Sequence, residues 1–479
     1  MGPGQSLAIC SVVAIERAVC FYQMAPFVVL TWALAPLMTF FVVAHPADRS
    51  QAPIIQQHSQ GYEFDPLLHL PGISPYFDAV GFGLEHTAPP GCTVTAASYL
   101  IRHGAIYSND DEYEKYIKPF LWKLEQHRDG WSGPLEFMSQ WVSPILEDRL
   151  EELTPSGAQD AQKVGAHLSK RYPKLVDTVR KVLTDKKSRT YDTAKALVKG
   201  FPHPEDIEVL RLKHNHNGSL DSLVPHKTCA AFTKDPGTDE MAKFVHHYAR
   251  HVADRLAPYT PFELSDTDVV GLQGICGYES AINGKRSPLC EVFTDAEWMS
   301  YEYAWDLKYA HMVGPLNHLS PYLGFPWLKA QSELFQQIDA TPDDMTASSA
   351  GPGWPSGQRF FLSFTHREVP PFVATAIGIF NSSSSAVEEF PTDRINWVRS
   401  WKMSDLIPFL GHVGMEQMTC EDRPGREGKY IRFIANTAPR PIPTCQDGPG
   451  ASCPLEDWVN IVAQGAEKYK GWDEVCAEK

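Results

Sequence analysis

The sequence predicts an α/β fold in which a buried sheet is combined with a large helical insertion. Three short apolar runs, rich in β-branched or aromatic residues, are expected to form strands at residues 92–101, 359–364 and 430–435. Long stretches with helical periodicity separate these runs along the chain. Strands that alternate with helical stretches are typical of a sheet covered by helices.

The expected helices follow from the spacing of apolar residues. Residues 156–172 place Ala and Leu on one face, residues 191–198 form a second helical pattern that Gly200 closes, and residues 298–309 form an aromatic-rich one. Two adjacent prolines at 370 and 371 suit the start of a further helix after the second strand.

The chain is expected to contain one folded domain and a preceding leader. The domain covers residues 50–479, with the helical insertion roughly within 110–185 and 205–340. Residues 1–49 are expected to be a targeting segment, because residues 25–44 carry no charge over 20 positions. As a helix this stretch is about 30 Å long, which matches the thickness of a bilayer core.

The fate of the leader stays open between two forms. Small residues at Val43, Ala44 and Ala47 are typical of a signal peptide cleavage site. An uncleaved leader would instead anchor the protein in a membrane through residues 25–44, the one membrane contact that we expect. In both forms the rest of the chain enters the secretory pathway. The folded domain is then either secreted or retained in the lumen of that pathway.

The composition limits the class of partner. The formal net charge is -15, whereas nucleic-acid binding needs a clustered basic face, so nucleic acid is excluded as a partner. A small-molecule substrate is expected instead, and the oligomeric state stays open.

The cysteines agree with export. Cys10 and Cys20 lie in the leader, and eight more follow in the domain. An even number in an exported domain predicts disulfides, although eight cysteines allow 105 pairings and their spacing selects none. The absence of a CxxC pair argues against a structural zinc site. Two glycosylation sequons, at Asn217 and Asn381, fit the same compartment.

Two of the expected strands end in a histidine flanked by charge. The first is followed by Arg102, His103 and Gly104, and the second by His366, Arg367 and Glu368. Ligands of open α/β sheets bind beyond the carboxyl ends of the strands, and helix starts there favour anions. A histidine pair in this place suits phosphoryl chemistry, because one ring can attack while the other holds the oxyanion.

Six ordered blocks from about residue 88 onward carry a family resemblance. They are Pro90-Gly91-Cys92, Arg102-His103-Gly104-Ala105, Leu153-Thr154-Pro155-Ser156-Gly157 with Arg171-Tyr172-Pro173, Ser188-Arg189 with Gly200-Phe201, Ser287-Pro288-Leu289-Cys290 with Glu297-Trp298, and Thr365-His366. With the matching cysteines, these blocks resemble the histidine acid phosphatases, specifically the fungal phytases and related acid phosphatases. The resemblance implies a histidine-phosphatase (phosphoglycerate-mutase-like) sandwich with a helical insertion domain.

The resemblance also implies roles for individual residues. His103 would be the nucleophile that forms a phosphohistidine, while Arg102, Arg189 and His366 would hold the phosphoryl oxygens. No cofactor or metal is implied. The implied disulfides are Cys92–Cys420, Cys229–Cys476, Cys276–Cys290 and Cys445–Cys453.

The sequence departs from the family pattern at two positions of the site. Ile106 stands where the family has a second arginine, and is expected to project toward the pocket, so that an arginine restored there should strengthen phosphate binding. Arg367 stands where most members have the acid that protonates the leaving alcohol. Glu368, one position later, is the candidate proton donor, at the spacing of the related multiple inositol polyphosphate phosphatases.

Three functions stay open at this point. The first is a secreted acid phosphatase that cleaves phosphate monoesters. The second is a repurposed enzyme in which His103, His366 and Glu368 do acid–base chemistry on a small non-phosphorylated molecule, with Ile106 lining an apolar pocket. The third is a catalytically inactive binding protein. The acidic residues Asp110, Asp111, Glu112 and Glu114 after the first histidine disfavour a substrate with six phosphates.

Overall fold

The computed structural model describes residues 64–81, 83–212, 223–340, 353–380, 390–423 and 426–477. The leader, with residues 25–44, and both sequons, at Asn217 and Asn381, lie outside these ranges. Within the described ranges, no helix has the length and apolar character needed to cross a bilayer.

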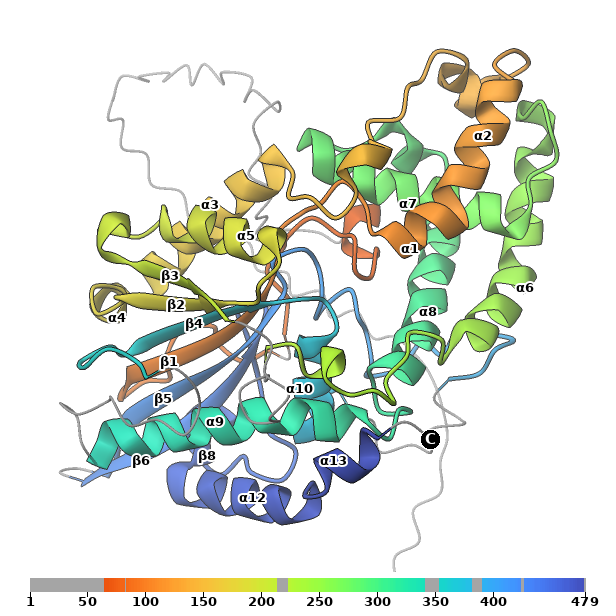
Figure 1. The fold of residues 1–479 in the computed structure, drawn as a ribbon. Coiled ribbons are helices and arrows are strands. Elements are labelled where there is room, and N and C mark those ends of the chain that lie inside the picture. The colour runs from red at the N-terminus through yellow and green to blue at the C-terminus, as the bar shows by residue number, and fades with distance from the viewer. Residues whose placement is uncertain are drawn as a thin grey trace, which may run out of the picture. The chain divides into compact units, whose positions relative to one another are not determined.

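The centre of the described chain is an eight-stranded sheet with the order β3-β2-β4-β1-β5-β6-β7, to which β8 adds by pairing with β6 (Figure 1). The strands are β1 (Cys92–Arg102), β2 (Lys181–Thr184), β3 (Glu208–Arg211), β4 (Phe360–Thr365), β5 (His412–Arg423), β6 (Arg426–Ala435), β7 (Ala438–Arg440) and β8 (Cys453–Pro454). β1, β4 and β6 confirm the three strands that the sequence predicts.

The sheet has a parallel half and an antiparallel half. β3, β2, β4 and β1 run parallel to one another, whereas β5 pairs antiparallel with β1 and with β6. The strands β2, β4 and β1 are neighbours, so their carboxyl ends meet at one edge of the sheet. This edge is where an open α/β sheet binds its ligands.

Strand alternation divides the core into two clusters on opposite faces of the sheet. On one face, Tyr99 and Leu362 pack with apolar residues of α3 (Pro155–Arg171) and α5 (Ser188–Val198). On the other face, Leu100 and Phe361 belong to the larger cluster, which continues into the helices. Because successive strand side chains point to opposite faces, both faces of the central strands must be apolar, and both are covered by helices.

The remaining helices fall into two groups (Figure 1). One group lies along the sheet and comprises α4 (Pro173–Val176), α9 (Ser320–Ala340), α10 (Val369–Ile377), α12 (Leu455–Lys468) and α13 (Trp472–Val475). The second group extends beyond the carboxyl edge and comprises α1 (Asp110–Glu112), α2 (Lys118–Gln126), α6 (Thr238–Leu256), α7 (Asp266–Asn283) and α8 (Asp295–Met312). Strand β2 falls at the end of a range that we expected to be helical.

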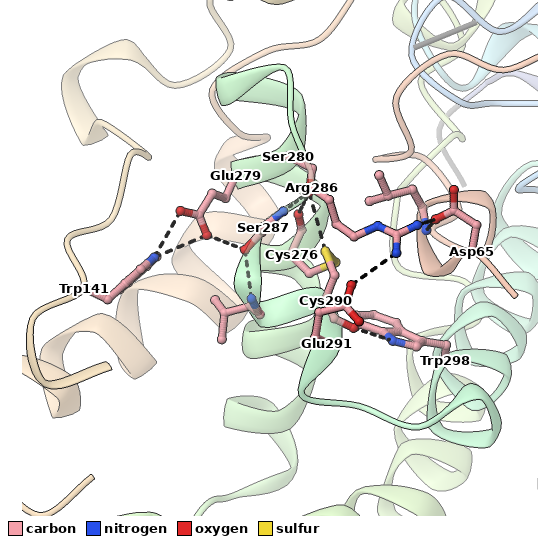
Figure 2. Close-up of a disulfide and its surroundings, with 12 residues drawn as sticks. Asp65, Trp141, Cys276, Glu279, Ser280, Arg286, Ser287, Cys290, Glu291 and Trp298 are labelled. Carbon is pink, nitrogen blue, oxygen red and sulfur yellow. Dashed lines mark hydrogen bonds and ion pairs between the residues drawn. A yellow bond between two sulfur atoms is a disulfide. The ribbon is translucent and has the colours of Figure 1, made fainter. Parts of the chain in front are cut away.

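The four disulfides that the resemblance implies are present: Cys92–Cys420, Cys229–Cys476, Cys276–Cys290 and Cys445–Cys453. Cys92 and Cys420 are also paired residues of β1 and β5. Figure 2 shows the Cys276–Cys290 bridge, which ties α7 to the segment that precedes α8. Beside it, Arg286 forms ion pairs with Asp65 and Glu291, so the start of the described chain is fastened to the same turn.

Candidate active site

Three neighbouring parallel strands end in the polar residues of the site. His103 follows β1, Asp185 follows β2 and His366 follows β4. Backbone hydrogen bonds continue past the strand ends, since the His103 N–H donates to the Thr365 carbonyl (3.0 Å) and the Asp185 N–H to the Phe364 carbonyl (3.1 Å). The sheet register therefore fixes the three side chains next to one another.

These side chains line a pocket of about 430 Å³ at the carboxyl edge. Its lining brings together His103, Arg189, His366, Arg367 and Glu368, five of the residues that the sequence singles out. The basic side chains that line it are Lys186, Lys187, Arg189, Lys227, Lys234 and Arg367. The carboxylates of Asp110, Glu151, Asp185 and Glu368 line the same pocket, so a chain with a net charge of -15 keeps an excess of basic side chains in this cavity, as the binding of a phosphate group requires.

His103 has one ring nitrogen committed to the backbone. Its Nδ1 lies 2.9 Å from the Gly104 carbonyl, and a carbonyl only accepts, so Nδ1 carries the proton and Nε2 keeps its lone pair. Burial holds the pKa of His103 well below its ordinary value, and the nearby cations Arg189 and Arg102 lower it further. A neutral ring with an unprotonated Nε2 is the form that attacks phosphorus.

The second histidine is held by Asp185, a residue that the sequence analysis missed. His366 Nε2 donates to the Asp185 carboxylate at 2.8 Å, and the Lys187 backbone N–H donates to the same carboxylate at 3.1 Å. Burial alone would raise the pKa of Asp185, but the hydrogen bond from His366 and those from the backbone hold it well below its ordinary value. Asp185 is therefore an anion that orients the His366 ring.

Arg189 reaches the pocket from the first turn of α5 and pairs there with Glu151. Its Nη1 lies 2.7 Å from Glu151 Oε2, and both residues line the pocket. Glu151 has a positive φ of 66°, which residues other than Gly, Asn and Asp rarely adopt. A strained backbone thus holds a carboxylate against the arginine that we expect to bind phosphate.

Arg102 is fully buried beside His103. Its Nη1 donates to the Ile407 carbonyl at 2.6 Å, and its guanidinium lies 4.6 Å from the centre of the Phe409 ring. Burial and the neighbouring Arg367 lower the pKa of Arg102 to about 10. In the part of the chain that the structure describes, its Nε and Nη2 have no hydrogen-bond partner, so donors suited to an anion remain there.

The expectation that Ile106 projects toward the pocket is wrong. Its side chain is fully buried and belongs to the large hydrophobic cluster. The cause is local backbone pairing: Ile106 forms an antiparallel bridge with Leu153, and the Thr154 N–H donates to the Ala105 carbonyl at 2.8 Å. This pairing turns residue 106 into the core, so no apolar wall of the pocket comes from it.

Arg367 and Glu368 lie together in the pocket, with Arg367 Nε 3.7 Å from Glu368 Oε1. Arg367 also forms a buried ion pair with Glu112. Burial alone would raise the pKa of Glu368, but His226, Arg367 and Lys234 hold it well below its ordinary value. The Glu368 carboxylate is thus ionised, and negative charge bound beside it would raise its pKa.

The chain is similar to known proteins over most of its length. Residues 93–436 match the model of the histidine phosphatase superfamily (branch 2). The chain is 28% identical to the acid phosphatase PHO1 of Komagataella pastoris, over 89% of this chain and 90% of that protein. It is 26% identical to phytase A of Penicillium oxalicum, over 84% of this chain and 91% of that one.

Solved structures show the same fold. The phytase from D. castellii superposes with a TM-score of 0.74 at 24% identity, covering 87% of this chain and 88% of that one. A Bifidobacterium longum multiple inositol polyphosphate phosphatase superposes with a TM-score of 0.58 at 13% identity, over 82% of this chain and 97% of that one. Since the family model covers most of the chain and includes both histidine motifs, the chain belongs to branch 2 of the histidine phosphatase superfamily.

Proposed function

We propose that the protein hydrolyses phosphate monoesters through a phosphohistidine on His103. One observation carries this proposal: His103, whose Nδ1 is bound to the backbone and whose Nε2 keeps its lone pair, lines a cavity that six lysine and arginine side chains also line. The relatives named above are an acid phosphatase and a phytase. Their names fit the transfer of a phosphoryl group from a small-molecule ester.

In the first step, His103 Nε2 attacks the phosphorus and the bond from phosphorus to the alcohol oxygen breaks. Arg189, which lines the pocket, stabilises the phosphoryl oxygens, as electrostatic stabilisation of a transition state requires. Arg102 is buried behind His103 and does not line the pocket, so it adds positive charge there from below the pocket surface. Arg367 adds a cation in the pocket. We infer that it takes the place of the family arginine missing at position 106.

Glu368 would supply the proton that the departing alcohol needs. The bound phosphate brings negative charge next to Glu368 and raises the pKa that the cations hold low. In the second step, water attacks the phosphohistidine while Glu368 takes up its proton. The bond from phosphorus to Nε2 breaks, which releases phosphate and restores neutral His103.

The repurposed enzyme is less well supported than the phosphatase. That alternative relied on Ile106 as part of an apolar pocket, and Ile106 lies in the core. The acidic residues thought to repel a charged substrate are also largely neutralised, since Glu112 pairs with Arg367 and Asp111 with Lys234.

The protein is also proposed to act outside the cytosol. Four disulfides are typical of oxidising compartments, which supports entry into the secretory pathway. N-terminal sequencing of the exported protein would show whether residues 25–44 are cleaved or retained as an anchor.

The hydrolysis of p-nitrophenyl phosphate at acid pH tests the proposed function. Wild-type protein should release p-nitrophenol, and the His103→Ala variant should lose at least about 10³-fold in kcat. Hydrolysis that His103→Ala leaves unchanged would remove His103 from the mechanism. Complete inactivity of a folded wild-type protein on phosphate esters would overturn the function itself.

A further inference from the structure

A second cavity, of about 290 Å³, adjoins the catalytic pocket. Lys234 and Arg367 line both cavities, so the second one opens next to the place where the phosphate is expected to bind. It lies among α6, α8 and the helical segment that follows the first histidine motif. A substrate whose phosphate contacts His103 can therefore extend its alcohol portion toward it.

The apolar part of the wall of this second cavity consists of aromatic and thioether side chains, which lie among charged ones such as Lys115, Asp235 and Lys308. Trp305 stacks on Tyr309, with ring centres 5.8 Å apart and an interplanar angle of 29°. Tyr116 meets Trp305 edge-on, with ring centres 6.2 Å apart. Met241 and Met312 complete the apolar lining. Such a surface binds flat apolar groups by burial and ring contacts.

The charged groups around the second cavity are largely satisfied by the protein itself. Lys234 Nζ lies 2.5 Å from the Asp111 carboxylate, and Arg367 pairs with Glu112. Lys308 Nζ donates to the carbonyls of Lys234 (2.5 Å) and Asp235 (3.2 Å). The surface left for a ligand is consequently more apolar than that of the catalytic pocket.

The backbone that carries Tyr116 is irregular and firmly placed. Residues Tyr113–Ile117 form a π-helical turn between α1 and α2, a feature that is frequent at functional sites. Gly271 of α7 packs directly against this turn, since a Cβ at residue 271 would lie 2.3 Å from the Tyr116 carbonyl oxygen. The close approach of α7 fixes the turn, and with it one wall of the cavity.

We propose that this cavity is a subsite for the alcohol portion of the substrate, and that it favours a phosphate monoester whose alcohol carries an aromatic ring. The inference rests on the proposed phosphatase function. A phenyl ring transferred from water to such a cavity should improve kcat/KM about tenfold or more over a short alkyl chain.

The test compares 2-phenylethyl phosphate with propyl phosphate. Both are esters of primary alkyl alcohols with similar leaving-group acidity, so the ratio of their kcat/KM values reports binding of the alcohol portion rather than bond strength. Wild-type protein should prefer 2-phenylethyl phosphate by about tenfold or more. Trp305→Leu should bring the ratio close to one, chiefly through a fall in kcat/KM for 2-phenylethyl phosphate.

Trp122→Leu is the matched control, because Trp122 lies on α2, is 65% exposed and is not part of the cavity lining. It should leave the ratio unchanged. Trp305 is buried, so circular dichroism must show that Trp305→Leu is folded. If it is not, Tyr116→Ala takes its place, because the Tyr116 ring is only partly buried.

The outcomes separate the two proposals. Turnover of both esters by wild-type protein with a ratio near one contradicts the aromatic subsite and leaves the phosphatase function standing. A preference for 2-phenylethyl phosphate that folded Trp305→Leu retains also contradicts the subsite. If neither ester nor p-nitrophenyl phosphate is turned over, the phosphatase function is wrong and the subsite is wrong with it.

Discussion

The Asp185 carboxylate, at the end of β2, accepts a hydrogen bond of 2.8 Å from His366 Nε2, at the end of β4. Both side chains line the pocket that contains His103, and the rings of His103 and His366 have centres 5.7 Å apart. The anionic Asp185 thus sets the orientation of the His366 ring, which lies beside the ring of His103. We regard Asp185 as a positioning residue for His366.

The Asp185→Asn variant should lower kcat on p-nitrophenyl phosphate about tenfold or more. The amide keeps the size of the side chain but removes the charge that holds the His366 ring. Burial lowers the pKa of His366 and the Asp185 carboxylate opposes this shift, so the variant should lower that pKa further. The pH profile of kcat should change shape as well, which a merely structural defect would not produce. Asp192→Asn is the control, because Asp192 is an exposed carboxylate on α5, the helix that follows Asp185 in the chain. An unchanged profile in Asp185→Asn would refute the positioning role.

The same carboxylate predicts a stability effect at low pH. The pKa of Asp185 is lowered in the folded protein, so its stabilising contribution is present above the ordinary aspartate pKa of about 4 and is lost as pH falls below it. Thermal unfolding of wild type and Asp185→Asn, compared between about pH 6 and pH 3, should show the difference in Tm shrinking toward acid. A difference that grows toward acid would contradict the assignment.

Glu151→Gln should tighten the binding of inorganic phosphate. Glu151 pairs with Arg189 at 2.7 Å and so competes with an anion for that arginine. The amide removes the charge while the positive φ stays, and the inhibition constant of phosphate should fall about tenfold. Glu151→Gly, which also relieves the backbone strain, separates the two effects in unfolding experiments. Weaker phosphate inhibition in Glu151→Gln would show that the carboxylate positions Arg189 rather than competing for it.

Activity should persist at acid pH because the nucleophile stays neutral there. The pKa of His103 is held well below the ordinary 6.5 by burial and by Arg189 and Arg102. The acid limb of kcat/KM should therefore lie below pH 6.5, and removal of a cation should move it upward. In Arg189→Gln the limb should shift to higher pH, whereas Lys195→Gln on the exposed side of α5 should leave it in place. A shift toward lower pH would contradict this account of His103.

Ile106→Arg should destabilise the protein instead of restoring phosphate binding. The side chain at 106 is fully buried in the hydrophobic cluster, and an unpaired guanidinium there costs at least about 3 kcal/mol of unfolding free energy. Ile106→Val should cost only about 1 kcal/mol. Urea unfolding of the two variants gives the comparison. A stable Ile106→Arg protein with tighter phosphate binding would show that residue 106 can turn toward the pocket.

Much of the fold followed from local sequence pattern. The strands at 92–101, 359–364 and 430–435 were predictable because apolar runs with β-branched or aromatic residues suit a buried sheet. The strands β2 and β3 were missed because each has only four residues, too few to show a period. β2 takes its place in the sheet by pairing with β4, which lies far away in sequence, and β3 takes its place by pairing with β2.

The site was predictable only in part, because some of its contacts also join residues that are far apart in sequence. His103, Arg189, His366 and Glu368 stand in short motifs that the family resemblance singled out, and the pocket contains all four. Asp185 was not predicted as a site residue because β2 was not recognised as a strand. An aspartate directly after a short run with β-branched residues was nevertheless a usable signal. Ile106 was misplaced because the bridge to Leu153, which turns it inward, joins segments 47 residues apart along the chain.

The most direct test of the central claim is to trap the phosphoryl group on the protein. Wild-type protein mixed with a labelled phosphate monoester at acid pH and quenched within milliseconds should carry label on His103, stable in base and labile in acid. The His103→Ala variant should carry none. With p-nitrophenyl phosphate, whose leaving group does not depend on a proton from Glu368, Glu368→Gln should accumulate more label because only breakdown of the intermediate slows. A wild-type protein that hydrolyses the ester while His103 never carries phosphate would contradict the proposed mechanism.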